Sequence, residues 1–306
     1  MELRIDNISK TYSNGVKALK NVSLTIPSGM YGLLGPNGAG KSTLMRILAT
    51  LQEADEGQVR LTSDGLSTGD GLDVLNQKDE VRRTLGYLPQ EFGVYPKVSA
   101  EGLLEHFAIL KGITGGQSRR EVVEALLRQT NLWDVRKQKL GGYSGGMRQR
   151  FGVAVALLGN PKLMIVDEPT AGLDPAERVR FLNLLSELGE KSVVILSTHI
   201  VEDVSELCTN MAIINKGEIL LEAQPLQAVS ELKGRIWRKL IEKHTLPDLE
   251  KEQQVISTKL LSGRTMVHIY SHNLPGNGFE LVEPDLEDVY FSTMAGYYGV
   301  KTQALV

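Results

Sequence analysis

The sequence predicts an α/β fold with a mainly parallel sheet as its core, a helical subdomain and a small C-terminal α+β appendage. Short β-rich runs alternate with longer helical patterns from the start to about residue 225, the order that builds a parallel sheet covered by helices. Four of the runs are almost continuously apolar, as expected for strands buried on both faces. These predicted strands are Met30–Leu34, Leu163–Val166, Val193–Leu196 and Met211–Ile214.

Helical spacing of apolar residues follows two of these strands. Lys41–Leu48 comes after the first strand, and Ala176–Leu188 comes after the second. A further amphipathic segment lies between Gln117 and Arg128. We therefore expect helices at these three places.

The texture of the sequence changes after Leu226. Val255–Leu261 and Thr265–Ser271 flank Ser-Gly-Arg as a predicted hairpin, and Pro284-Asp285 introduces a short helix that runs to Met294. We place a small C-terminal domain at residues 226–306. Upstream, residues 63–71 (SDGLSTGDG) predict a mobile surface loop, to which we assign no function.

Composition excludes some classes of protein. With 34 Lys+Arg against 37 Asp+Glu in 306 residues, the chain has no net basic field, and we expect no nucleic-acid partner. The single cysteine, Cys208, cannot form an intramolecular disulfide, and we expect it to be a small buried residue. No run of 18 or more apolar residues is present and the N-terminus lacks a signal-peptide core, so we expect a cytosolic chain.

Residues 35–43, GPNGAGKST, fit G-x-x-x-x-G-K-[ST] and stand between a predicted buried strand and a predicted helix. Glycines let the backbone wrap phosphates, so that successive N–H groups and the helix N-terminus face the negative charge. We expect Lys41 to reach the β- and γ-phosphates and Ser42 to hold Mg²⁺. A glycine-rich turn that binds nothing is the alternative, and the flanking strand and helix argue against it. The expected contacts are Gly35, Asn37, Gly38, Ala39, Gly40, Lys41, Ser42 and Thr43.

Two carboxylates follow another buried strand. Asp167 and Glu168 end the run LMIVDE, at the carboxyl edge where open α/β sheets bind ligands. We expect Asp167 to coordinate Mg²⁺ through water and Glu168 to act as general base toward the attacking water. An Asp-Glu pair alone is usually a solvated strand end, but its place after a buried strand favours the catalytic interpretation.

The first 225 residues, with these motifs in this order, resemble the nucleotide-binding subunits of ATP-binding cassette (ABC) transporters. The resemblance implies a P-loop NTPase cassette at 1–225, with its helical subdomain at about 91–160, that binds ATP and Mg²⁺. Tyr12 occupies the position of the aromatic residue that stacks on adenine. Gln90 is similar to the glutamine that senses Mg²⁺ and the attacking water, and His199 to the switch histidine at the γ-phosphate.

Residues 143–150, YSGGMRQR, resemble the family signature, and 171–174, AGLD, resemble the dimer-contact loop. The resemblance implies a homodimer in which Ser144, Gly145, Gly146 and Asp174 of one subunit complete the nucleotide site of the other. An ordinary helix N-cap with flexible glycines is the alternative for the signature residues alone. The signature usually begins with Leu, and the Tyr143 found here puts its local packing in question.

We therefore expect the ATP-hydrolysing subunit of an ABC transporter that powers export of an unidentified substrate through a separate multispan membrane subunit. Residues 79–90 and 287–291 resemble exporter-type members. An importer ATPase and a soluble ABC ATPase acting on ribosomes or DNA remain alternatives. The chain would be cytoplasmic and peripheral on the inner face of the membrane, its residues 226–306 serving regulation or dimer contact. We expect the partner to dock near Gln90 and 91–110, where Phe92, Val94 and Tyr95 are expected to be exposed.

Overall fold

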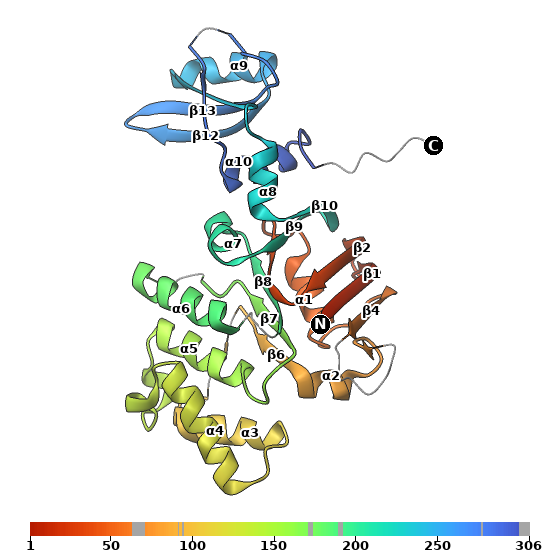
Figure 1. The fold of residues 1–306 in the computed structure, drawn as a ribbon, viewed down its shortest axis with the longest axis vertical. Coiled ribbons are helices and arrows are strands. Elements are labelled where there is room, and N and C mark those ends of the chain that lie inside the picture. The colour runs from red at the N-terminus through yellow and green to blue at the C-terminus, as the bar shows by residue number, and fades with distance from the viewer. Residues whose placement is uncertain are drawn as a thin grey trace.

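The computed structural model describes residues 1–62, 71–90, 92–93, 95–170, 174–188, 192–276 and 278–299. A six-stranded sheet in the order β10-β9-β3-β8-β7-β6 forms the centre (Figure 1). Its pairs are parallel except for β10 against β9. All four predicted buried strands are confirmed as members of this sheet. The bounds are β3 Gly29–Leu34, β6 Leu85–Leu88, β7 Leu163–Asp167, β8 Val193–Thr198, β9 Asn210–Asn215 and β10 Glu218–Ala223.

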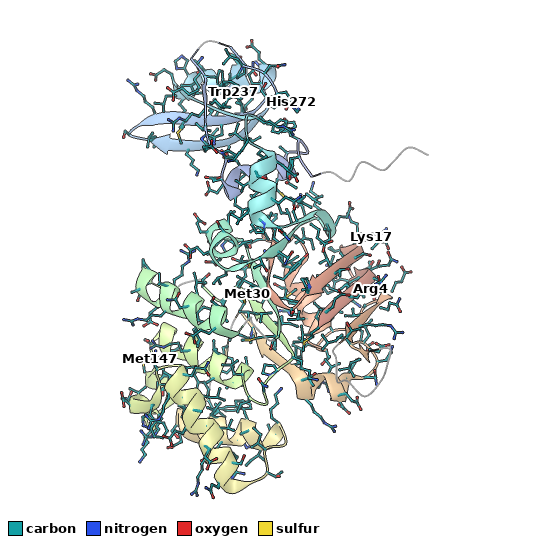
Figure 2. All side chains as sticks on the ribbon, viewed as in Figure 1. Arg4, Lys17, Met30, Met147, Trp237 and His272 are labelled. Atoms are coloured by element: carbon teal, nitrogen blue, oxygen red, sulfur yellow. The ribbon has the colours of Figure 1, made fainter. Side chains whose placement is uncertain are left out.

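A second, antiparallel sheet in the order β2-β1-β4-β5 lies beside the first, and the sequence analysis did not predict it. Buried apolar residues alternate with exposed ones along its strands, which is typical of a sheet with one face on the core. Arg4 and Lys17 extend from its outer side in Figure 2. The bounds are β1 Glu2–Thr11, β2 Lys17–Pro27, β4 Glu56–Thr62 and β5 Leu72–Asp73.

Helices separate and cover these sheets. α1 (Lys41–Leu48), predicted with the same bounds, buries Leu44, Met45, Ile47 and Leu48 in a core that it shares with residues of both sheets. The opposite face of the central sheet packs against α6 (Pro175–Leu188) and α7 (Val201–Leu207). Cys208, just after α7, is buried as expected, and burial raises the pKa of its thiol to about 12. α2 (Lys78–Thr84) packs on the α1 side of the central sheet, where its Val81 is part of the core that contains α1.

The helical subdomain contains α3 (Ala100–Leu110), α4 (Gly116–Gln129) and α5 (Gly145–Ala156), which share a separate hydrophobic core. Tyr143 is 2% exposed within this core, and its hydroxyl donates to the Val135 carbonyl at 3.0 Å, so the subdomain accommodates a tyrosine at that position. The expectation that Phe92 is exposed was wrong. Its ring is partly buried and meets Phe151 edge-on, with the ring centroids 6.0 Å apart. Tyr95 is 65% exposed, as expected, and Val94 lies outside the described residues.

The C-terminal part has a four-stranded sheet in the order β12-β13-β11-β14. The predicted hairpin is confirmed as β12 and β13, and the predicted helix as α10, which Asp285 begins with a capping box. α10 packs on α7, on α8 and on β9 and β10 of the central sheet, so the hydrophobic cluster continues across residue 225. The bounds are α8 Pro225–Glu231, β11 Ile236–Ile241, α9 Leu246–Glu252, β12 Val255–Leu261, β13 Arg264–Tyr270, β14 Glu280–Leu281 and α10 Leu286–Met294.

Two further expectations concern the predicted surface loop and membrane-spanning segments. Residues 63–70 of the predicted surface loop lie outside the described residues. None of the helices within the described ranges is both long enough and apolar enough to cross a bilayer.

Candidate nucleotide site

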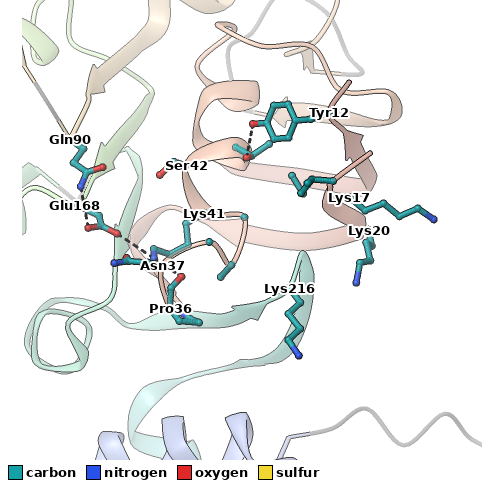
Figure 3. Close-up of a pocket in the computed structure, with 16 residues that line it drawn as sticks. Tyr12, Lys17, Lys20, Pro36, Asn37, Lys41, Ser42, Gln90, Glu168 and Lys216 are labelled. Atoms are coloured by element: carbon teal, nitrogen blue, oxygen red, sulfur yellow. Dashed lines mark hydrogen bonds and ion pairs between the residues drawn. The ribbon is translucent and has the colours of Figure 1, made fainter. Parts of the chain in front are cut away.

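A cleft of about 780 Å³ lies over the loop that joins β3 to α1 (Figure 3). Gly40, in this loop, has φ of 110°, which favours glycine, and a Cβ there would stand 2.6 Å from the Ala18 carbonyl oxygen. The loop therefore presents its backbone and the α1 N-terminus to the cleft. The expected residues of this loop and of the start of α1 that line the cleft are Asn37, Gly38, Ala39, Gly40, Lys41, Ser42 and Thr43, and Tyr12, Gln90 and Glu168 line it as well.

Lys41 is almost fully buried beneath this loop, with 4% of its side chain exposed. Its ammonium donates to the carbonyl oxygens of Gly35 at 2.7 Å and Pro36 at 3.2 Å, and it lies 3.3 Å from Glu168 Oε1. Gly35 thus holds Lys41 rather than lining the cleft. The buried ammonium has its carboxylate partner on one side, so a phosphate can pair with it from the cleft.

Asp167, at the end of β7, is 3% exposed. Burial raises the pKa of its carboxyl group, while the hydroxyls of Ser197 and Ser42 and the charge of Lys41 act in the opposite direction. Within the part of the chain that the structure describes, Asp167 Oδ1 makes no hydrogen bond although it is buried. A buried carboxylate oxygen without a donor, beside a serine hydroxyl, is a set of oxygen ligands that suits Mg²⁺.

Glu168 gathers three of the predicted residues around one carboxylate. Its Oε1 faces Lys41, and its Oε2 lies 3.1 Å from His199 Nδ1 and 3.5 Å from Gln90 Nε2. Glu168 itself has φ of 47°, an uncommon conformation for a residue with a side chain, and its N–H donates to the Ser197 carbonyl at 2.8 Å. Such backbone strain is held by the surrounding structure and is concentrated at functional sites.

Tyr12 follows β1 and stands at the opposite end of the cleft from Glu168 (Figure 3). Its hydroxyl is 3.0 Å from Thr43 Oγ1 and 3.4 Å from Gln52 Oε1, which fixes the ring beside the start of α1. The side chain is 36% exposed, so part of an aromatic surface is available to a ligand. A flat group bound at this end would have its phosphates directed toward Lys41.

The predicted signature residues lie elsewhere. Ser144 begins α5 and accepts a hydrogen bond from the Met147 N–H, and Asp174 begins α6 by accepting one from the Glu177 N–H. Among the described residues that line the cleft, none is Ser144, Gly145, Gly146 or Asp174. Residues 171–173 of the predicted dimer-contact loop fall outside the described residues. A single chain therefore does not bring the described signature residues to its own cleft.

The cleft also contains residues that the sequence analysis missed. Lys17, Lys20 and Lys216 line it, and Lys216 comes from the turn between β9 and β10. That turn reaches the phosphate loop because the Gly217 N–H donates to the Ala39 carbonyl at 2.9 Å. The sequence separation between these residues hides the contact. Only a Lys-Gly pair after a predicted buried strand could have indicated a turn at this edge.

Comparison with known proteins agrees with this geometry. A family model described as ABC transporter matches residues 19–171. The ABC transporter ATP-binding protein YxlF of Bacillus subtilis is 30% identical, over 95% of this chain and 99% of YxlF. The linearmycin resistance ATP-binding protein LnrL of the same organism is 33% identical, over 76% of this chain and 72% of LnrL.

Among solved structures, a dimeric ATP-binding cassette in a post-hydrolysis state bound to ADP and Pi has a TM-score of 0.64 and 29% sequence identity. The match covers 72% of this chain and 98% of that one. A dimer structure of a bacterial ABC transporter cassette has a TM-score of 0.64 and 28% identity, over 72% of this chain and 98% of that one. The chain belongs to the ATP-binding proteins of ABC transporters, and it is an ATP-hydrolysing cassette.

Proposed function

We propose that this ATPase powers export through a separate membrane subunit, and that Glu168 is the general base of its hydrolytic reaction. The observation that carries the catalytic part is the set of contacts around Glu168, where Lys41, Gln90 and His199 meet one buried carboxylate. A base must lie within hydrogen-bond reach of the attacking water and be oriented by its neighbours. These contacts supply the orientation.

The residues would divide the work as follows. The phosphate loop and Lys41 hold the triphosphate, and Tyr12 receives the adenine ring. Glu168 accepts a proton from the attacking water. Gln90, whose Nε2 lies beside Glu168 Oε2, orients that water. His199, 43% exposed on its side chain, donates toward the γ-phosphate.

Mg²⁺ fits the residues present, since Ser42 and Asp167 offer oxygen ligands and Asp167 Oδ1 has no donor within the described residues. When bound, the ion neutralises phosphate charge in the transition state. Ser42, Asp167 and Gln90 are the residues that we propose to hold it.

A homodimer would complete each site. Ser144 caps α5, whose first N–H groups form a second anion-binding helix terminus. Because the described signature residues do not line the cleft of their own chain, we infer that they close the cleft of a second copy. Similar cassettes have been solved as dimers, which supports this arrangement.

The membrane subunit would dock in an apolar groove of about 370 Å³ between α1 and the helical subdomain. Leu51 and Leu110 on its rim are 63% and 68% exposed, and Tyr87 and Phe107 line it. Gln90 follows β6, the strand that carries Tyr87, which links the groove to the Glu168 contacts. Cysteine crosslinking to a cytoplasmic loop of a co-expressed membrane subunit tests the docking region, from Leu110→Cys on the rim of the groove and from Tyr95→Cys outside it, and Leu261→Cys in the C-terminal sheet is the control. A crosslink from the control alone would move the docking surface elsewhere.

Export is supported by the similarity to LnrL, whose name records linearmycin resistance. We further propose that residues 226–306 form a regulatory or dimer-contact domain. The experiment for export is ATP-dependent movement of a reporter compound out of cells or into inverted vesicles that contain the membrane subunit. Movement in the opposite direction, or full activity without any membrane subunit, would favour the importer or the soluble alternative.

A further inference from the structure

Asp203 is a buried carboxylate that the proposed reaction does not use. It lies in the first turn of α7 and has 0% of its side chain exposed. A carboxylate without solvent is costly unless hydrogen bonds and an opposite charge compensate it. Asp203 has both, and its partners come from the segments that follow Glu168 and precede His199.

Oδ1 of Asp203 faces a guanidinium. Arg178 of α6 donates from Nε at 2.8 Å, and its Nη2 lies 2.7 Å from the same oxygen. Oδ2 accepts two hydroxyl groups, from Thr170 at 2.6 Å and from Thr198 at 3.3 Å. Both threonines are buried, with 4% and 1% exposed. Three hydrogen-bond donors on three segments, and a second guanidinium nitrogen in an ion pair, therefore converge on one carboxylate.

Thr198 connects this cluster to the switch histidine. Its hydroxyl donates to Asp203 and also accepts the N–H of Ile200 at 3.0 Å. The hydrogen bonds of one hydroxyl thus fix the backbone immediately before and immediately after His199. This turn is what places His199 Nδ1 at 3.1 Å from Glu168 Oε2.

Thr170 connects the Asp203 carboxylate to the segment that follows Glu168, the proposed general base. It stands two residues after Glu168, and the intervening Pro169 carbonyl accepts a hydrogen bond from Gln149 of α5. The segment after Glu168 is therefore held from two sides. Asp203 ties it to the His199 turn, and Gln149 ties it to the helix that Ser144 begins.

We propose that Asp203 is a positioning residue for ATP hydrolysis, which holds the His199 turn and the segment after Glu168 in one fixed relation. Asp203 is not among the described residues that line the cleft. The inference rests on the role proposed above for His199. A misplacement of about 1 Å at a catalytic group can cost about 10²-fold in rate, so a link of this kind has a measurable effect on turnover.

The test compares isosteric variants of the full-length chain. Asp203→Asn keeps the shape of the side chain but loses its charge and one accepting oxygen. Thr198→Val keeps the shape but loses the hydroxyl, whereas Thr198→Ser keeps the hydroxyl. Thr293→Val in α10 is the matched control, because Thr293 is 1% exposed and its hydroxyl donates within its own helix, to the Val289 carbonyl.

We expect Asp203→Asn and Thr198→Val to lower kcat by about 10-fold or more per folded molecule, while the Kd for ATP changes by less than about 2-fold. Thr198→Ser is expected to retain most of the activity. In a His199→Ala background, Thr198→Val is expected to cost little more, because both changes disable the same group. A purely structural threonine would give the same fold-loss in both backgrounds.

Three outcomes would overturn the inference. The first is that Asp203→Asn and Thr198→Val reduce kcat no more than Thr293→Val does after correction for the folded fraction. The second is that the effects of Thr198→Val and His199→Ala multiply independently. The third is that His199→Ala leaves hydrolysis unchanged. This third outcome would refute the role proposed for His199 as well, whereas the first two refute only the positioning role of Asp203.

Discussion

Replacing Glu168 by Gln tests the base and the dimer together. The amide keeps the size of the side chain and one accepting oxygen, which can face Lys41, while its NH2 group takes the position that faces Gln90 and His199; it cannot take up a proton. Glu168 is only 8% exposed, so little solvent can supply a substitute base at that position. We expect hydrolysis to fall by about 10²-fold or more, which corresponds to about 2.7 kcal/mol in the barrier.

Binding of ATP is expected to persist in this variant, because the phosphate loop and Lys41 are unchanged. Unhydrolysed ATP would then hold two subunits together across the shared sites. Size-exclusion chromatography with and without ATP measures the dimer, and a phosphate-release assay measures turnover. The matched control is Glu124→Gln on the surface of α4, where the glutamate pairs with Arg128 of the same helix, and it is expected to behave as wild type.

A second substitution separates the two parts of the argument. Ser144→Arg added to Glu168→Gln puts bulk and charge where the partner's phosphate would sit, and it is expected to abolish the ATP-dependent dimer. Wild-type turnover by Glu168→Gln would remove Glu168 as the base. An unaltered monomer at saturating ATP would show that the sites are not shared as proposed.

Three more predictions concern the cleft. Tyr12→Ala is expected to weaken ATP binding by about 1–3 kcal/mol, while Tyr12→Phe and Tyr12→Trp retain it, since base stacking needs only the ring; equal affinities in a titration would exclude Tyr12 from the adenine site. Lys41→Ala is expected to abolish tight triphosphate binding, because the phosphate loses a buried paired charge, and an unchanged Kd for ATP would contradict this. Asp167→Asn is expected to raise the Tm of the nucleotide-free protein at neutral pH and to remove the stabilisation by Mg²⁺-ATP. The pKa of Asp167 is raised in the folded state. Its contribution to the free energy of unfolding is therefore favourable below the pKa of the unfolded state, and it is lost as the pH rises through the pKa of the folded state. The difference in Tm between variant and wild type should therefore grow from acid to neutral pH, and melting curves with a constant or shrinking difference would refute the assignment.

Local patterns were enough to predict the parallel sheet, α1 and the C-terminal hairpin. Each of these elements depends on residues close in sequence, and the spacing of their apolar residues and their turn residues indicate the structure. The phosphate-loop residues were found for the same reason, since the loop at 35–43 is continuous, whereas Tyr12, Gln90 and His199 were assigned from the resemblance to the family. The contacts of Glu168 with Gln90 and His199 agree with the topology, because parallel strands end at one edge of the sheet.

Other features depend on distant partners and were missed. The antiparallel sheet pairs β1 with β4 across more than forty residues of sequence, and nothing local in either strand specifies its partner. Phe92 was expected to be exposed, but whether an aromatic residue in an irregular segment faces solvent or Phe151 is decided by the packing of α5. The Asp203 cluster is equally invisible, because an acidic residue in the first turn of a helix normally only complements the helix dipole.

The hydrophobic cluster that continues across residue 225 links α7 to α10. The first turn of α7 carries Asp203, while Val204 and Cys208 pack in the cluster that also contains Leu286 and Val289 of α10. Protein interiors are close-packed and have low compressibility, so a displaced helix moves its neighbours. We therefore expect a displacement of the His199 turn during the ATPase cycle to shift α10 and the strand β12 that α10 contacts, so that the C-terminal part would respond to changes in the nucleotide site.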